Sequence, residues 1–257
     1  MSLFARPRPE AVTGEMWHET LDALPMLDGL DGEEDARLRQ IAGVLLAEKQ
    51  WSAAGGLVLD DAMRVRVAAQ AGLLVLNLGA EWYRGWVEII VYPDEFVPRH
   101  EWTDEAGVVH VSPHPLAGEA WERGPLILSW ADAGRAGPFE GANVVIHEFA
   151  HKLDMLDGRT DGLPPLHRDM RIADWAAAFQ PAFDNFAKSV DAGKDTGLDP
   201  YAAENPAEFF AVVTEYFFEA PDVISEDFPA VYEQLKRFFR QDPLARFIQW
   251  EERNASP

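Results

Sequence analysis

The segment His147-Glu-Phe-Ala-His151 constrains the possible folds of this chain more than any other feature. Residues four apart lie on the same face of a helix, so the two imidazoles can bind one metal ion. Apolar residues such as Val145, Phe149 and Leu153 recur around them and predict a largely buried helix over residues 142–156. Unpaired buried polar groups are costly. The fold must therefore bring partners to both histidines.

Glu148 lies beside His147 and can reach the position where such a metal would hold water. Zn²⁺ lowers the pKa of its bound water from 15.7 to about 7, which makes hydroxide available at neutral pH. Glu148 can take a proton from this water and pass it to a leaving amine. The alternative is a helix whose histidines make ordinary hydrogen bonds, because so short a pattern also arises by chance.

A catalytic zinc site usually has three protein ligands and one open position. No third histidine follows at close spacing, and His167 is the only later one. Glu208 and Glu215 are better candidates, because they share one face of a strongly apolar helix predicted over residues 206–219. A carboxylate buried there needs a partner, and a metal ion would serve. Spacing alone does not choose between them. The acidic residues considered for this position are Glu204, Glu208, Glu215 and Glu219.

The remaining pattern predicts an α+β architecture in which helices precede and follow a small mixed sheet, without alternating βαβ units. Residues 1–140 are expected to form a lobe of helices and sheet. Residues 141–257 are expected to form a helical lobe that completes one catalytic unit. Besides residues 142–156 and 206–219, the predicted helices are residues 31–49, 60–76, 172–190 and 228–240 and a last helix beyond Pro243. The predicted strands are residues 86–92, 107–111 and 125–130.

Composition excludes several classes of protein. The chain has no cysteine, so it has no disulfides, thiolate metal sites or cysteine nucleophiles. Its 44 acidic and 22 basic residues give a net charge of -22, which argues against binding nucleic acid or an anionic membrane. No apolar stretch is long enough to cross a bilayer, and the N-terminus has no secretory signal pattern. These features favour a cytoplasmic protein.

Two long motifs carry a resemblance to a known family. Residues 147–154, His-Glu-Phe-Ala-His-Lys-Leu-Asp, and residues 201–218, which begin Tyr-Ala-Ala-Glu-Asn-Pro-Ala-Glu, resemble the Mlc titration factor A family of zinc metallopeptidases. Residues 107–110 and 124–130 are also similar to that family's pattern. The resemblance extends from about Trp17 to Phe247. It implies a zincin-like fold related to the catalytic domain of anthrax lethal factor.

The resemblance also implies roles for individual residues. It implies that His147, His151 and Glu208 hold one Zn²⁺ per chain and that Glu148 is the catalytic acid and base. Tyr201 would donate its hydroxyl to the oxyanion of the tetrahedral intermediate. The other expected roles lie around these residues: His110 as an additional ligand that closes the site, and Asp154 and Glu215 as residues that support the ligands. By analogy with zincins, the strand at residues 125–130 would lie at a sheet edge and pair with an extended peptide.

The site residues and the family resemblance leave three functions to compare. The first is an aminopeptidase-like zinc peptidase. The second is a non-catalytic protein that sequesters an Mlc-like repressor of sugar-uptake genes, a partner that the resemblance implies. The third is a zinc deaminase, which the absence of cysteine disfavours because the usual deaminase ligands include cysteine.

Overall fold

The structure, a computed structural model, describes residues 12–93, 100–103, 109–112, 124–134 and 141–254, and of residues 100–103 and 109–112 only the backbone. The α-helices in this part of the chain are α1 (Gly14–Asp22), α2 (Gly32–Glu48), α3 (Asp61–Leu74), α4 (Trp130–Ala133), α5 (Val144–Asp154), α6 (Ile172–Asp191), α7 (Pro206–Glu219), α8 (Pro221–Asp227), α9 (Pro229–Phe239) and α10 (Pro243–Asn254). Short 3₁₀ helices are η1 (Pro25–Leu27), η2 (Ala80–Tyr83), η3 (Met155–Asp157) and η4 (Pro200–Ala203).

The main sheet has three parallel strands in the order β1–β2–β5. These strands are β1 (Gln50–Ala53), β2 (Glu88–Tyr92) and β5 (Leu126–Ser129). Two further strands, β3 (His100–Thr103) and β4 (Val109–Ser112), pair with each other in antiparallel fashion. The prediction of a small sheet among helices is confirmed, but the sheet is parallel where a mixed one was predicted. The prediction that βαβ units are absent is also wrong, because α3 connects the parallel strands β1 and β2.

Helix starts follow the capping signals in the sequence. Asp31 caps α2 by accepting hydrogen bonds from the backbone N–H groups of Glu33 and Glu34, while the Glu34 carboxylate accepts from the N–H of Asp31. Asp60 caps α3, whose second half is buried on all sides as predicted. The predicted helix over residues 206–219 coincides with α7.

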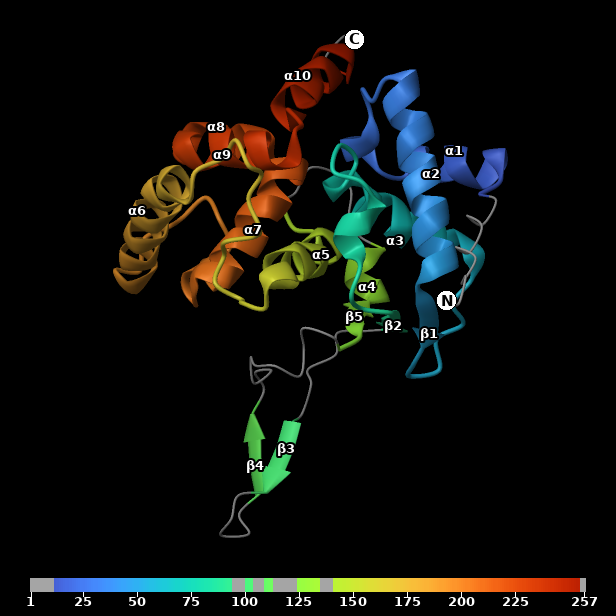
Figure 1. The fold of residues 1–257 in the computed structure, drawn as a ribbon, viewed down its shortest axis with the longest axis horizontal. Helices are drawn as coiled ribbons and strands as arrows, with labels where there is room; N and C mark the ends of the chain where they lie inside the picture. Colours follow the sequence, from blue (N-terminus) through green and yellow to red (C-terminus); the bar gives the residue numbers. More distant parts are fainter. Residues whose placement is uncertain (1–11, 94–99, 104–108, 113–123, 135–140, 255–257) are drawn as a thin grey trace.

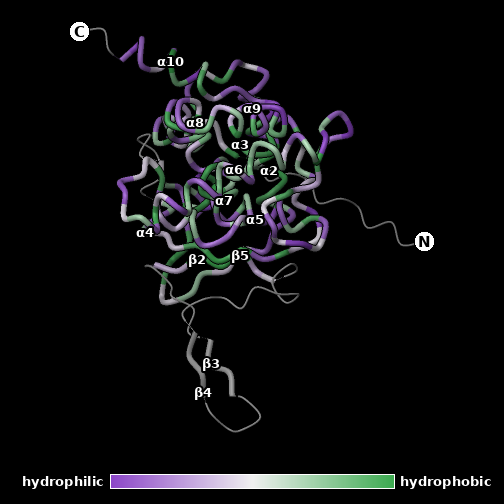
Figure 2. Tube along the Cα trace, turned by 90° about the vertical axis from the view of Figure 1, so that its left-hand side faces the viewer, coloured by the Kyte–Doolittle hydropathy of each residue, from purple (hydrophilic) through white to green (hydrophobic). Residues whose placement is uncertain are grey.

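Helices α5 and α7 lie side by side in the interior. Figure 1 shows them between α1, α2 and α3 on one side and α6, α8 and α9 on the other. Helix α5 also contacts β5, the strand at one edge of the described three-stranded sheet. Figure 2 shows the hydrophobic parts of the trace gathered in the interior and the hydrophilic parts on the outer helices.

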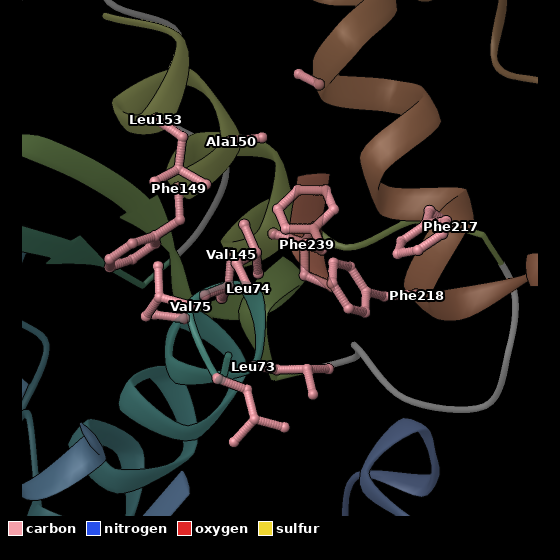
Figure 3. Close-up of a cluster of buried hydrophobic side chains, with 14 of the residues drawn as sticks. Leu73, Leu74, Val75, Val145, Phe149, Ala150, Leu153, Phe217, Phe218 and Phe239 are labelled. Atoms are coloured by element: carbon pink, nitrogen blue, oxygen red, sulfur yellow. The ribbon is translucent and has the colours of Figure 1, made fainter. Parts of the chain in front are cut away.

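One contiguous hydrophobic core joins residues from both halves of the chain. The end of α3 meets α5, and the aromatic residues of α7 and α9 close the cluster on the other side (Figure 3). The residues of this cluster labelled in Figure 3 are Leu73, Leu74, Val75, Val145, Phe149, Ala150, Leu153, Phe217, Phe218 and Phe239. Burial of aromatic side chains of this size dominates core energetics, so the core holds α5 and α7 firmly together. Among the described helices, none is long and apolar enough to span a membrane.

Candidate metal centre

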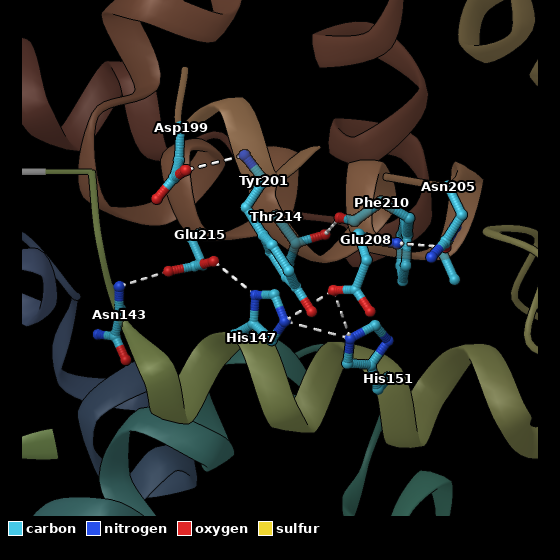
Figure 4. Close-up of polar contacts among 11 residues, drawn as sticks. Asn143, His147, His151, Asp199, Tyr201, Asn205, Glu208, Phe210, Thr214 and Glu215 are labelled. Carbon is cyan, nitrogen blue, oxygen red and sulfur yellow. Dashed lines mark hydrogen bonds and ion pairs between the residues drawn. The ribbon is translucent and has the colours of Figure 1, made fainter. Parts of the chain in front are cut away.

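Three donor atoms converge where α5 faces α7. His147 Nε2 lies 3.1 Å from Glu208 Oε2, His151 Nε2 lies 3.2 Å from the same oxygen, and the two Nε2 atoms are 3.2 Å apart (Figure 4). The three side chains are nearly buried, with 14, 13 and 16% of their surface exposed. In the described part of the chain, this is the one group of at least three histidine or acidic side chains able to hold a metal ion.

The spacing of these atoms fits a metal ion. Ligands of a tetrahedral Zn²⁺ at bond lengths near 2.1 Å lie about 3.4 Å from one another, close to the observed separations. Two imidazole nitrogens that face each other across 3.2 Å cannot both direct lone pairs inward without a cation between them. The geometry is therefore that of a ligand set, with His147, His151 and Glu208 as the residues that would hold the ion.

The charges around the centre also favour a bound metal ion. Burial alone would lower the pKa of His147, but hydrogen bonds to Glu208 and Glu215 outweigh burial and raise that pKa well above its usual range. Burial would raise the pKa of Glu208, but its contacts with His147 and His151 hold that pKa well below its usual range. The surrounding carboxylates thus favour a positive charge at the centre, and a metal cation would supply one.

The orientation of the His147 ring is set by a carboxylate at its Nδ1 atom. Its Nδ1 lies 2.7 Å from Glu215 Oε1, and this carboxylate is buried on α7 two turns after Glu208. A carboxylate on the far nitrogen of a metal-ligating histidine fixes the tautomer that points Nε2 at the metal. Of the two acidic residues between which spacing could not decide, Glu208 joins the donor atoms and Glu215 supports a histidine.

Comparison with known proteins places this site in a family. The sequence pattern of the family described as glucose-regulated metallo-peptidase M90 matches residues 5–240. The chain belongs to the M90 family. It is similar to proteins named Mlc titration factor A from Yersinia pestis (strain Pestoides F) and Yersinia pseudotuberculosis serotype O:3 (strain YPIII). Each is 41% identical over 253 residues, which cover 97% of this chain and 93% of the relative. The predicted family resemblance is confirmed.

In this M90 metallo-peptidase, Tyr201 lies beside the metal centre and is partly exposed. It belongs to η4, and its ring is tilted against that of His147 with centroids 6.1 Å apart. Its hydroxyl lies beside Glu208 (Figure 4). Burial, with the nearby carboxylates, raises the pKa of Tyr201 far above its usual value, so the phenol keeps its proton. Asp199 holds the turn by accepting a hydrogen bond from the Tyr201 backbone N–H.

Glu148 follows His147 on α5 and is half-buried. The charge of its carboxylate raises the pKa of both His147 and Tyr201, so Glu148 lies within electrostatic reach of the metal centre. This position is compatible with the predicted acid–base role, which stays a prediction until it is tested.

Asp154 makes no hydrogen bond to His151 among the described residues, and its support of the ligands stays a prediction. His151 Nδ1 and Asp154 Oδ1 are both buried without a hydrogen-bond partner among the described residues. The other oxygen of Asp154 accepts a hydrogen bond from the N–H of Gly162, and burial raises the pKa of Asp154 to about 6. Asp154 thus holds the loop that follows α5.

Of the remaining candidates, three lie outside the group of donor atoms and the fourth, His110, lies outside the described side chains. His167 donates a hydrogen bond to the carbonyl of Phe238 and packs against aromatic rings, so it is not part of the centre. Glu204 is exposed, and Glu219 is buried four residues beyond Glu215. His110 belongs to β4, whose side chains lie outside the described residues, and its role as a ligand stays a prediction.

For two polar residues next to the centre, no role was predicted from the sequence. Asn143 caps α5 through a hydrogen bond from the N–H of Ile146, and Gln70 projects from the fully buried part of α3. Each had a signal. Asparagine directly before an apolar helical run is a preferred N-cap, and a glutamine within an otherwise apolar buried run must find a hydrogen-bond partner.

Proposed function

We propose that this chain is a zinc-dependent peptidase with aminopeptidase-like activity. The observation that carries the proposal is the convergence of His147, His151 and Glu208 from two helices of a chain that belongs to a metallo-peptidase family. Two imidazoles and one carboxylate are a ligand set of catalytic zinc in peptidases, and they leave one position for water and substrate. The preference for an amino terminus rests on the family resemblance.

Each protein group has a task in hydrolysis of a peptide bond. When bound, Zn²⁺ supplies Lewis acidity and a water of lowered pKa. Glu148 takes one proton from the attacking water as its oxygen bonds to the carbonyl carbon. Tyr201 donates its hydroxyl to the carbonyl oxygen as that oxygen becomes negative. Glu148 then passes its proton to the leaving nitrogen as the C–N bond breaks. β5, at one edge of the described three-stranded sheet, would pair with the extended substrate and orient it.

Cleavage of a mixed peptide pool, read by mass spectrometry, tests this proposal. The zinc-loaded protein should cut peptides, and Glu148→Gln should lose at least about 10²-fold in rate because a glutamine amide cannot accept the proton of the attacking water. Glu226→Gln, the same change at an exposed position on α8, is the control and should cleave normally. Cleavage by Glu148→Gln at the wild-type rate would contradict the assigned role, and no cleavage by the wild type would count against peptidase activity.

A second function is supported by the names of the relatives. Proteins 41% identical to this chain are named Mlc titration factor A. We propose that this chain also binds a repressor of that type, with or without catalysis. Glu148→Gln separates the two functions, because it should bind such a repressor with unchanged affinity in a calorimetric titration while its hydrolysis is lost. If this variant still binds the repressor and still relieves repression of the sugar-uptake genes in cells, the function is sequestration of the repressor and not peptidase activity.

A further inference from the structure

Asn143 is bonded through its backbone and both ends of its side chain. It lies four residues before His147 at the N-cap of α5 and is 2% exposed. Its side-chain oxygen accepts a hydrogen bond from the N–H of Ile146 at 3.0 Å. Its amide nitrogen donates to Gln70 Oε1 at 2.9 Å and to Glu219 Oε1 at 2.6 Å. One side chain therefore joins α5 to both α3 and α7. Capping alone would require only the oxygen.

The backbone of Asn143 is tied to the same carboxylate that orients His147. Glu215 Oε2 accepts a hydrogen bond from the Asn143 N–H at 2.6 Å, while Glu215 Oε1 lies 2.7 Å from His147 Nδ1. The two oxygens thus contact α5 at points one turn apart. Because a carboxylate held at both oxygens cannot rotate, the direction in which it holds the imidazole is fixed by the position of Asn143.

These contacts form a ladder along the facing sides of α5 and α7. On α5, positions 143, 147 and 151 are spaced by four residues. On α7, Glu208 meets the two histidines, Glu215 bridges His147 and position 143, and Glu219 meets the side chain at position 143. The metal donors are the last step of this ladder. A slip of one residue along either helix is about 1.5 Å, which is large against a zinc–ligand bond near 2.1 Å.

We propose that Asn143 is a positioning residue for the metal centre. Its amide N–H groups bond to Gln70 on α3 and to Glu219 on α7 and thereby set the position of α5 relative to both helices, so that His147 and His151 meet Glu208 at ligand spacing. This inference rests on the metal site of the proposed function. It differs from a capping role, because it assigns the effect to the amide nitrogen and not to the oxygen that caps the helix.

Cobalt binding to the full chain distinguishes the two roles. Serine is as good an N-cap as asparagine but has no amide N–H groups, so Asn143→Ser keeps the cap and loses the bonds to Gln70 and Glu219. We expect its affinity for Co²⁺, followed by the visible d–d absorption of the bound ion, to fall about tenfold or more, as for other residues that support metal ligands. Asp60→Ser, which also introduces serine as an N-cap but on α3, should leave the affinity unchanged.

Gln70→Met provides the second variant. It removes one acceptor of the Asn143 amide by a change of similar shape and leaves the α5 cap intact, so it tests the inference even if Asn143→Ser does not fold. We expect weaker Co²⁺ binding and an altered d–d spectrum, with the helical circular dichroism of the metal-free protein retained. Wild-type affinity and spectrum in both variants, or in Gln70→Met alone if Asn143→Ser is unfolded, would overturn this inference and leave the metal site standing. A wild type that does not bind Co²⁺ would overturn both.

Discussion

At the scale of single residues, the centre is a balance of charges held by short contacts. Glu208 and Glu215 approach His147 from opposite sides, one at each ring nitrogen. Removing either carboxylate would leave the other contacts in place but would lower the negative potential that attracts a cation. In the proposed metal site the two carboxylates would have separate tasks, Glu208 as a donor to the metal and Glu215 as the support of His147.

Tyr201 is predicted to act on the transition state and not on metal binding. Its phenol lies beside Glu208 and remains protonated, so it can donate to a developing oxyanion. Tyr201→Phe should lower kcat by about 10²-fold, the cost of losing one such donor, with little change in KM. Steady-state kinetics on a cleaved peptide measure this split. Zinc affinity should be unchanged, and a variant with wild-type kcat would exclude the role.

The sequence predicted much of this centre, because its ligands lie in regular helices. Helical spacing placed His147 and His151 on one face without knowledge of the fold. Spacing could not choose Glu208 over Glu215, since that choice depends on how α5 and α7 pack. The bonds of Asn143 to Gln70 and Glu219 were not predicted, because they join residues more than 70 positions apart in the chain.

At the scale of elements, the start of α7 is fixed by a close backbone approach. Gly162 has a φ of +76°, and a Cβ at this position would lie 2.4 Å from the carbonyl oxygen of Pro206. Since backbone cannot move aside cheaply, Gly162→Ala should displace the loop or the first turn of α7 that carries Glu208. We expect a loss of about 2–4 kcal/mol in the free energy of unfolding, measured by denaturant titration.

Gly193 provides the matched control for this prediction. Its φ is +64°, but a Cβ at this position would have no atom within 4 Å, so Gly193→Ala adds strain without a clash. Its cost should be only about 1 kcal/mol. Equal losses in the two variants would show that backbone conformation, and not the approach to Pro206, accounts for the effect.

The end of α2 carries a buried lysine with a defined pH dependence. Lys49 follows α2, is 8% exposed, and donates hydrogen bonds to the carbonyls of Tyr83 and Trp86. Burial lowers its pKa from 10.5 to about 8, with Glu48 opposing the shift and Lys152 adding to it. Between these two pH values the unfolded chain binds more protons than the folded protein. The contribution of Lys49 to the free energy of unfolding therefore rises with pH through this window. Below the window Lys49 is charged in both states, and the penalty for burying its charge is complete.

Comparison with Lys49→Met isolates this dependence. The free energy of unfolding of the wild type, minus that of the variant, should increase between about pH 8 and pH 10.5 by at most about 3 kcal/mol. Urea titrations at several pH values measure the difference, and the lost hydrogen bonds contribute a constant offset. A difference that does not change with pH would contradict the assigned burial effect.

The elements that sequence did not predict are short or lack a periodic apolar pattern. β1 has four residues, Gln50–Ala53, of which two are polar, so it resembles a loop until β2 pairs with it. α1, Gly14–Asp22, buries only Trp17 and Thr20, which do not form a recognisable stripe. The parallel sheet was missed with β1, because the α3 crossover is visible only when both of its strands are recognised.

At the scale of the whole molecule, the two sequence halves share one hydrophobic core. Metal donors come from the second half, and α3 and the described three-stranded sheet, which come largely from the first half, pack against the helix that carries them. Long apolar helices and the family motifs made the general arrangement predictable. The packing between halves was not, because it depends on contacts between residues distant in sequence.

The anomalous scattering of zinc in crystals of the zinc-loaded protein tests the metal centre most directly. We expect a single strong peak per chain at the zinc absorption edge, about 2.0–2.2 Å from His147 Nε2, His151 Nε2 and a carboxylate oxygen of Glu208. Glu208→Gln, which keeps the shape of the side chain, should weaken or remove the peak. No peak between α5 and α7, or a peak bound by other residues while these three remain uncoordinated, would contradict the account.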